Sequence, residues 1–270
     1  MSVWFITGAS RGLGAEIAKA ALAAGHDVVG TARDASAISD ASLALTLDVT
    51  DEVQAKTAVD AAVERFGRID VLVNNAGRGL LGAVEEATDA AARAVFDTNV
   101  FGLLNVTRAV LPVMRAQRSG HVLNMGSVGG FTQGPGWGVY GATKFAVEGL
   151  SEAMHAELAP LGVHVTVVEP GYFRTDFLDS SSLHVADGVI ADYAGTAGAM
   201  RITAAERNHD QPGDPARAAT VLLDVVGSPT PPLRIQLGAD SVARVEAKLQ
   251  LVHQELDAWR KWSVSTDHAG

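Results

Sequence analysis

The chain has 270 residues, 47% hydrophobic and 19% charged, which is enough apolar content for a folded core. Its net charge of −10 provides no bulk attraction to nucleic acid or an anionic membrane, so we expect neither as a partner. The absence of cysteine excludes disulfides and thiolate nucleophiles, and the eight histidines show no metal-binding spacing, so we expect no metal. No secretory signal or long apolar run is found, which predicts a cytoplasmic protein.

Short apolar runs alternate with helical patterns along the chain. One helix begins near Gly12 and stops at Gly25, another covers about 140–158, and a shorter one follows Pro215. Strands that alternate with helices favour a parallel sheet covered on both faces, in one domain spanning 1–270. The seven expected strands are 3–7, 27–31, 43–47, 71–74, 121–125, 163–168 and 233–237.

Two segments depart from this rhythm. Residues 172–212 are rich in Ala, Gly, Ser and Asp and follow a strand directly, which is typical of a substrate lid. Residues 240–262 are expected to form a C-terminal helix with one apolar stripe. We expect the stripe to pack on the body of its own subunit, with a subunit contact as the alternative. The stripe has spacings of 3, 4, 3, 4 and 3 and consists of Val242, Val245, Leu249, Val252, Leu256 and Trp259.

A glycine-rich turn joins the first strand to the first helix. Gly8, Gly12 and Gly14 follow the spacing Gly-x-x-x-Gly-x-Gly. Glycines let the backbone approach a pyrophosphate, and the helix that begins near Gly12 directs free N–H groups at it. Glycines are common in β–α turns, but this position in the first β–α unit favours a dinucleotide site.

The end of the second strand bears on the choice of cofactor. A carboxylate there would bind the ribose hydroxyls of NAD, whereas this sequence has Ala32 followed by Arg33. Arg11, in the glycine turn, could reach the same place, and two guanidinium groups can clamp a 2′-phosphate. This favours NADP(H), with NAD(H) as the alternative because Asp34 lies one residue further on.

Tyr140, Lys144 and Ser127 form a candidate catalytic set. Tyr140 and Lys144 are four residues apart on a predicted helix and share one face, and Ser127 follows the fifth strand at the carboxyl edge of the sheet. Hydride addition to a carbonyl builds negative charge on its oxygen, which a proton donor and a hydrogen-bond donor must meet. Tyr140 would supply the proton and Ser127 the hydrogen bond. We expect the Lys144 ammonium to lower the pKa of Tyr140.

From about residue 3 to 240 these motifs resemble the short-chain dehydrogenase/reductase family in its single-domain form, and in particular its ketoreductase and hydroxysteroid-dehydrogenase-like branch. The resemblance implies a Rossmann-type, doubly wound α/β fold. It also implies that Asn99, in Asn99-Val100-Phe101-Gly102, holds a water in a proton relay with Ser127, Tyr140 and Lys144. Gly126 and Gly141 depart from the residues common in the family, but neither carries a required group.

Further residues match the parts of the family that contact the cofactor. Asp48 matches the acid that meets adenine, Asn74–Gly77 the stretch after the fourth strand, and Thr175 the threonine that meets the carboxamide. Together, the glycine turn, the strand ends and the resemblance predict cofactor contacts from Gly8, Ser10, Arg11, Gly12, Leu13, Gly14, Arg33, Asp48, Val49, Asn75, Ala76, Gly77, Tyr140, Lys144, Pro170, Gly171 and Thr175.

The expected substrate is a small molecule, a bulky hydrophobic ketone or aldehyde, because the candidate pocket residues are large and mostly apolar. Two alternatives stay open: an NAD-dependent alcohol or hydroxysteroid dehydrogenase working oxidatively, and a non-enzymatic dinucleotide sensor. The resemblance implies a homodimer or homotetramer. The candidate pocket residues are Val128, Phe131, Trp137, Tyr172, Phe173 and Phe177.

Overall fold

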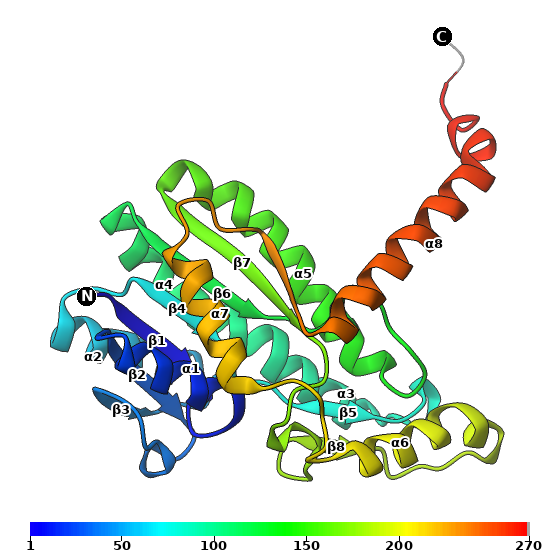
Figure 1. The fold of residues 1–270 in the computed structure, drawn as a ribbon, viewed down its shortest axis with the longest axis horizontal. Coiled ribbons are helices and arrows are strands. Elements are labelled where there is room, and N and C mark those ends of the chain that lie inside the picture. Colours follow the sequence, from blue (N-terminus) through cyan, green and yellow to red (C-terminus); the bar gives the residue numbers. More distant parts are fainter. Residues whose placement is uncertain (269–270) are drawn as a thin grey trace.

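A computed structural model, which describes residues 1–268, shows a seven-stranded parallel sheet at the centre of the molecule (Figure 1). Every neighbouring pair in the sheet is parallel. The predicted doubly wound α/β fold is therefore confirmed. In spatial order the strands are β3 (Leu43–Thr46), β2 (Asp27–Ala32), β1 (Val3–Thr7), β4 (Val71–Asn74), β6 (Gly120–Met125), β7 (Val163–Pro170) and β9 (Arg234–Leu237).

Helices cover both faces of this sheet. Side chains of β1 alternate between the two sides, so that Phe5 joins one hydrophobic cluster and Trp4 and Ile6 join the other. The cluster on the Phe5 side includes residues of α2 (Glu52–Phe66), α4 (Leu103–Gln117) and α5 (Gly138–Leu158). The cluster on the Trp4 side is closed by α1 (Gly12–Ala23) and α7 (Pro215–Gly227). Because β1 is buried on both faces, all five of its residues are apolar or hydrogen-bonded.

A single turn of π-helix lies between α3 (Asp89–Phe96) and α4. This turn covers Asp97–Gly102 and includes Asn99, which is buried. Extra residues in a helical turn shift the side chains that follow and are frequent at functional sites. The turn packs against α5 and therefore joins α3 and α4 to the helix that carries Tyr140 and Lys144.

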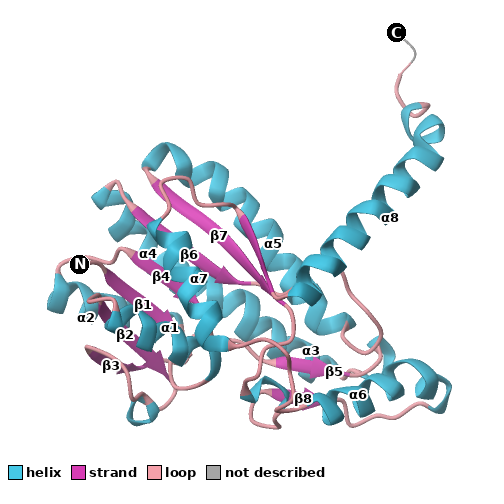
Figure 2. Cartoon of the chain, viewed as in Figure 1, coloured by secondary structure: helices cyan, strands magenta, loops and turns pink. Residues whose placement is uncertain are grey.

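The 172–212 segment contains regular structure that its composition did not predict. β8 (Leu183–Val185) pairs in parallel with β5 (Gly79–Leu81), and the two strands form a small sheet apart from the central one (Figure 2). Helix α6 (Ala199–Arg207) follows β8. Leu183 and Leu81 are buried in a separate cluster with Tyr140 and Trp137. The segment is thus tied to the chain that follows β4.

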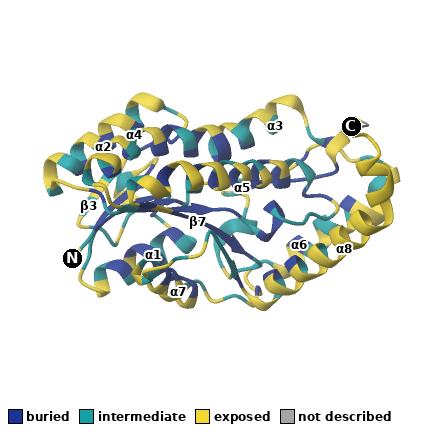
Figure 3. Ribbon diagram, turned by 90° about the horizontal axis from the view of Figure 1, so that it is seen from above, coloured by how far each residue is buried: buried dark blue, intermediate teal, exposed yellow. Residues whose placement is uncertain are grey.

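The last helix, α8 (Ala239–Val264), begins beside β9 and extends away from the body (Figure 1), and most of its residues are exposed (Figure 3). Only Ser241 and Val245 are buried among its residues, whereas Leu249, Leu256 and Trp259 are exposed. The expectation that its stripe packs on the body of its own subunit is wrong, because the sheet ends at β9 and offers α8 support only at its base. None of the helices within residues 1–268 is long and apolar enough to cross a membrane.

Candidate active site

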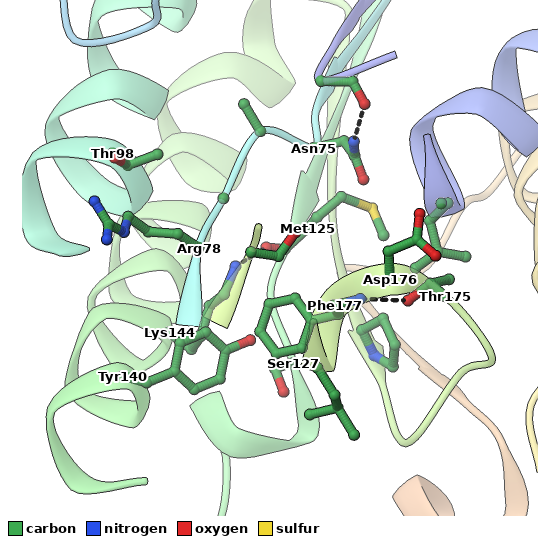
Figure 4. A pocket seen from close by; sticks show the side chains of 18 of the residues that line it. Asn75, Arg78, Thr98, Met125, Ser127, Tyr140, Lys144, Thr175, Asp176 and Phe177 are labelled. Carbon is green, nitrogen blue, oxygen red and sulfur yellow. Dashed lines mark hydrogen bonds between the residues drawn. The ribbon is translucent and has the colours of Figure 1, made fainter. Parts of the chain in front are cut away.

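A cleft of about 850 Å³ lies at the carboxyl edge of the central sheet. The ends of β1, β2, β4, β6 and β7 open into it, which is where ligands bind in folds of this kind. The cleft is shared by three groups of residues, namely the glycine turn after β1, the Ser127–Tyr140–Lys144 set and the start of the 172–212 segment (Figure 4). The edge of the sheet therefore brings together residues that lie far apart in the sequence.

The glycine turn has the backbone shape that a close ligand requires. Gly8 and Gly12 have φ angles of +64° and +58°, a region that side chains disfavour. A Cβ atom on Gly14 would overlap the Gly8 carbonyl oxygen, so Gly14 allows α1 to pack against the turn and does not itself line the cleft. The side-chain amide of Asn75 donates hydrogen bonds to the carbonyls of Thr7 and Gly8, at 2.9 and 3.0 Å. The turn is thereby held to the end of β4.

Arg33 and Asp34 both line the cleft at the end of β2, beyond the buried Ala32. The Asp34 carboxylate accepts hydrogen bonds from the Ser36 backbone and hydroxyl, at 3.0 and 2.7 Å. Among residues 1–268, no carboxylate forms an ion pair with Arg33. The guanidinium of Arg33 is thus available to an anionic ligand, whereas Asp34 already caps a short turn.

Arg11 lies differently from our expectation. Its guanidinium donates hydrogen bonds to the Ser181 hydroxyl and carbonyl, at 2.8 and 3.0 Å, and to the Ser182 hydroxyl at 2.9 Å. These contacts join the glycine turn to the 172–212 segment. The expected clamp of two arginines is therefore reduced to Arg33, because Arg11 is committed to the other side of the cleft.

Ser127, Tyr140 and Lys144 converge in the cleft, as their spacing predicts (Figure 4). Tyr140 and Lys144 project from α5, and the Lys144 ammonium lies 5.8 Å from the Tyr140 ring centre. Lys144 donates a 2.6 Å hydrogen bond to the Met125 carbonyl at the end of β6. Ser127 begins the short turn that follows β6, and its hydroxyl accepts a bond from the Gly129 N–H.

Burial is the largest influence on the pKa values of Tyr140 and Lys144. It raises the pKa of Tyr140 to about 12, an effect that the Ser127 side chain opposes in part. It also lowers the pKa of Lys144 to about 8, against the charge of Glu148, which acts to raise it. The expected net lowering of the Tyr140 pKa is thus wrong for this site, because desolvation of the phenol outweighs the stabilisation that an ammonium gives to a tyrosinate. Tyr140 is protonated at neutral pH, as a proton donor must be.

Asn99 acts from behind the cleft. Its side-chain oxygen accepts from the Arg78 N–H at 2.9 Å, and its amide nitrogen donates to the Arg78 carbonyl at 2.9 Å and to the Thr143 hydroxyl at 3.0 Å. Thr143 in turn donates to the Tyr140 carbonyl at 2.6 Å. Within the described residues, Asn99 does not line the cleft. Its side chain braces the chain after β4 against α5, and its expected part in a proton relay stays a prediction.

A buried charged group lies behind Lys144, one turn further along α5. The Glu148 carboxylate is nearly buried and accepts a 3.0 Å bond from Arg234 of β9. Arg234 also lies 3.6 Å from Glu169 and pairs with Glu152. Burial first, and then the neighbouring Glu169, raises the pKa of Glu148 to about 7. No sequence motif indicated this group, because it forms only when β7, β9 and α5 come together.

Most of the expected substrate residues line the cleft. The Trp137 and Phe177 rings lie 5.7 and 5.6 Å from the Tyr140 ring, centre to centre. The prediction for Phe131 is wrong, because Phe131 does not line the cleft. After the turn Val128–Gly130, it is Val128 and Gln133 that line the cleft. Residues that we did not predict are supplied by the 172–212 segment and α8, namely His184, Met200, Gln211 and Arg244. Their positions depend on long-range packing and had no local signal.

The remaining expected contacts can be placed directly. The cleft is lined by Gly8, Ser10, Arg11, Gly12, Leu13, Arg33, Asp48, Val49, Asn75, Ala76, Gly77, Pro170, Gly171 and Thr175, together with Val128, Trp137, Tyr172, Phe173 and Phe177. Asp48 also accepts from the Thr50 N–H and hydroxyl, which orders the turn after β3.

Comparison with known proteins agrees with this geometry. The family model described as short chain dehydrogenase matches residues 2–185, which include the glycine turn and the Ser–Tyr–Lys set. The chain belongs to the short-chain dehydrogenase family. Members of this family are oxidoreductases, so the reaction class expected from Tyr140, Lys144 and Ser127 is supported at that level.

Relatives of this short-chain dehydrogenase extend over nearly its whole length. An oxidoreductase of Botryotinia fuckeliana is 37% identical and covers 98% of both chains. The 3-ketodihydrosphingosine reductase of Bacteroides thetaiotaomicron is 37% identical over 86% of each. Among solved structures, a short-chain dehydrogenase from Streptomyces avermitilis has a TM-score of 0.91 and 41% identity, covering 99% of this chain and 100% of its own.

A more distant structure has the same fold. The 3-ketoacyl-(acyl-carrier-protein) reductase of Brucella melitensis, complexed with NADH, has a TM-score of 0.74 and 25% identity. It covers 89% of this chain and 98% of its own.

Proposed function

We propose that this short-chain dehydrogenase reduces the carbonyl group of a ketone or aldehyde to an alcohol, with NADPH as cofactor and Tyr140 as general acid. The observation that carries the proposal is the convergence of Ser127, Tyr140 and Lys144 in the same cleft as the glycine turn. A tyrosine that stays protonated, a serine hydroxyl and a buried lysine together meet the charge that develops on a carbonyl oxygen.

Ser127, Tyr140 and Lys144 would each have a separate role in the reduction. The bound NADPH supplies the hydride. Ser127 donates a hydrogen bond to the carbonyl oxygen, and Tyr140 transfers its phenolic proton to that oxygen as the negative charge develops. The Lys144 ammonium, held by the Met125 carbonyl, stabilises the tyrosinate that remains. The apolar rings of Trp137 and Phe177 keep water away from the transfer.

The shape of the cleft fits a dinucleotide. Gly8 and Gly12 adopt positive φ angles, and Gly14 leaves no room for a side chain, so backbone N–H groups at the start of α1 can approach a pyrophosphate. Asp48 would meet the adenine. Arg33 would bind a 2′-phosphate, which favours NADPH because Ala32 stands where NAD-binding members carry an acid.

NAD(H) is the second candidate, with the enzyme working oxidatively on an alcohol. The observation that favours it is Asp34, which also lines the cleft, and the Brucella melitensis structure holds NADH. The hydrogen bonds between Asp34 and Ser36 argue against it, because they already engage one oxygen of the carboxylate in a short turn.

Replacing Arg33 decides between the two cofactors. We expect Arg33→Asp to weaken NADPH binding about 10- to 100-fold, the value of charge-assisted hydrogen bonds to a phosphate, and to change NADH binding little. Fluorescence titration with each cofactor measures both dissociation constants. Arg217→Asp, on the outer surface of α7, is the matched control. Equal losses for NADPH and NADH would show that Arg33 does not meet the phosphate.

The substrate side of the cleft favours a bulky hydrophobic carbonyl compound. Val128, Trp137, Tyr172 and Phe177 line it, and we assign the 172–212 segment as the lid that closes over them. The Bacteroides thetaiotaomicron relative is a 3-ketodihydrosphingosine reductase, which agrees with ketone reduction. The test is NADPH oxidation over steroid, quinone, polyketide-like and small diketone substrates. No turnover with any of them would favour a dinucleotide sensor over an enzyme.

A further inference from the structure

Helix α8 carries an apolar face that the described part of the chain leaves uncovered. Beyond its first two turns none of its side chains is buried, and Leu249, Leu256 and Trp259 are 55%, 49% and 64% exposed. Helices gain most of their stability in proteins from packing such a face. The outer two-thirds of α8 therefore has the pattern of a packed helix without the packing.

The spacing of the face indicates what would cover it. Val242, Leu249 and Leu256 repeat every seven residues, and Val245, Val252 and Trp259 lie three residues after each of them. This is the a and d pattern of a coiled coil, whose seam is covered by a second helix. Three other exposed apolar residues of α8 fall outside these positions: Trp262 lies at the edge of the seam, at a g position, and Leu251 and Val264 lie off it.

The charges on α8 argue against a membrane as the covering surface. Helices that lie on bilayers are rich in Lys and Arg on their polar face. Here acidic and basic residues are equal in number, and the whole chain has a net charge of −10. The acidic residues are Asp240, Glu246, Glu255 and Asp257, and the basic ones are Arg244, Lys248, Arg260 and Lys261.

We propose that α8 pairs with α8 of a second copy of this chain, antiparallel, about a twofold axis between Leu249 and Val252. In this register each layer of the seam joins a smaller side chain to a larger one. Val242 meets the partner's Trp259, Val245 meets the partner's Leu256, and Leu249 meets the partner's Val252. The twofold axis repeats each contact, so the surface is complementary to itself.

The flanking charges fit the same register. In an antiparallel pair, the g positions of the two helices face each other, as do the e positions. Lys248 then lies opposite the partner's Glu255, and Glu246 opposite the partner's His253. Within residues 1–268, neither Lys248 nor Glu255 forms an ion pair in its own chain. A parallel pair would place Lys248 against the partner's His253 and Trp259 against the partner's Trp259.

This pairing also bears on the cleft. Arg244, at the base of α8, lines the cleft and donates a 3.0 Å hydrogen bond to the Thr132 carbonyl, beside the turn that carries Ser127. A partner helix laid along α8 steadies this base. The inference is independent of the proposed reaction, because its tests measure contact between two copies.

Disulfide trapping tests the pairing, and the chain has no cysteine of its own to interfere. We expect the double variant Val242→Cys, Trp259→Cys to form a covalent dimer with oxidised glutathione as the oxidant, seen on a non-reducing gel. Neither single variant should cross-link with itself, because equal positions lie far apart in an antiparallel pair. The control Ala247→Cys, Gln254→Cys places both thiols on the opposite helix face and should form no covalent dimer.

Charge reversal in the double-cysteine background tests the register. Lys248→Glu or Glu255→Lys alone turns two attractive contacts repulsive, and each should slow cross-linking about tenfold, whereas the combined reversal restores it. No covalent dimer in the double variant, self-cross-linking of either single variant, or a combined reversal no faster than the single reversals would overturn the proposal.

Discussion

The two longest helices of this short-chain dehydrogenase differ sharply in what surrounds them. Helix α5 has 21 residues, nine of them buried, and among these are polar groups such as Tyr140, Lys144 and Glu148. Helix α8 has 26 residues and buries two. Figure 1 shows α8 extending away from the body, and Figure 3 shows exposed residues along most of its length.

The difference shows what an amphipathic pattern can predict about the packing of a helix and what it cannot. On α5 the pattern includes polar residues at buried positions, because the sheet edge supplies partners for them. On α8 the apolar residues repeat regularly along one face, yet the chain itself covers only the first two turns of the helix. A periodic stripe predicts that a face will be covered, but not by which chain. The following substitutions test the two helices from the largest expected effect to the smallest.

Removing the phenolic hydroxyl of α5 should have the largest effect. We expect Tyr140→Phe to lower kcat for carbonyl reduction about 10³-fold, the usual contribution of a general acid, with NADPH binding preserved. Steady-state rates and a cofactor titration measure the two quantities separately. Tyr193→Phe is the matched control, because that half-buried tyrosine donates a hydrogen bond to Glu85 and does not line the cleft. Wild-type rates in the Tyr140→Phe variant would show that Tyr140 is not the general acid.

The same substitution on both helices compares their packing directly. Val147 of α5 is completely buried against Leu103 and Val167, whereas Val252 of α8 is 44% exposed. We expect Val147→Ala to lower the free energy of unfolding by about 2 kcal/mol. Val252→Ala should change it by less than about 0.5 kcal/mol at protein concentrations low enough to keep copies apart. Urea unfolding of both variants measures the difference, and similar losses would show that α8 is packed after all.

The smallest expected effect is a shift in pH dependence. Burial lowers the pKa of Lys144 to about 8, so its charge, and with it the reduction rate, should fall as pH rises through about 8. The Glu148 carboxylate holds that pKa up, so Glu148→Gln should move the alkaline limb of the rate profile to lower pH. Glu152→Gln, an exposed partner of Arg234, is the control. An unchanged limb in Glu148→Gln would show that Glu148 does not act on Lys144.

The sequence predicted the central sheet, and the meeting of Ser127, Tyr140 and Lys144 in one cleft, for physical reasons. Strands buried on both faces are mostly apolar, so β1 and β4, and the apolar residues of β6, stand out between helices. Parallel strands bring their carboxyl ends to one edge, so Ser127 and the α5 face of Tyr140 and Lys144 had to meet there. These inferences needed only local pattern and chain order.

What the sequence did not predict depends on long-range contacts. Gly79–Leu81 is too short to be recognised as a strand until Leu183–Val185 lies beside it. Arg11 looked available for a phosphate because nothing local indicated Ser181 as its partner. The pKa of Tyr140 followed from the depth of its burial, which residue spacing does not report.

The pairing of β5 with β8 has a consequence for how the molecule folds. The paired residues are separated by about a hundred positions, so joining them early would cost the chain a large loop entropy for three residues of pairing. The central strands must first bring the two segments together. The substrate side of the cleft is therefore assembled late, and we expect its amide hydrogens to exchange by local opening sooner than those of the central sheet.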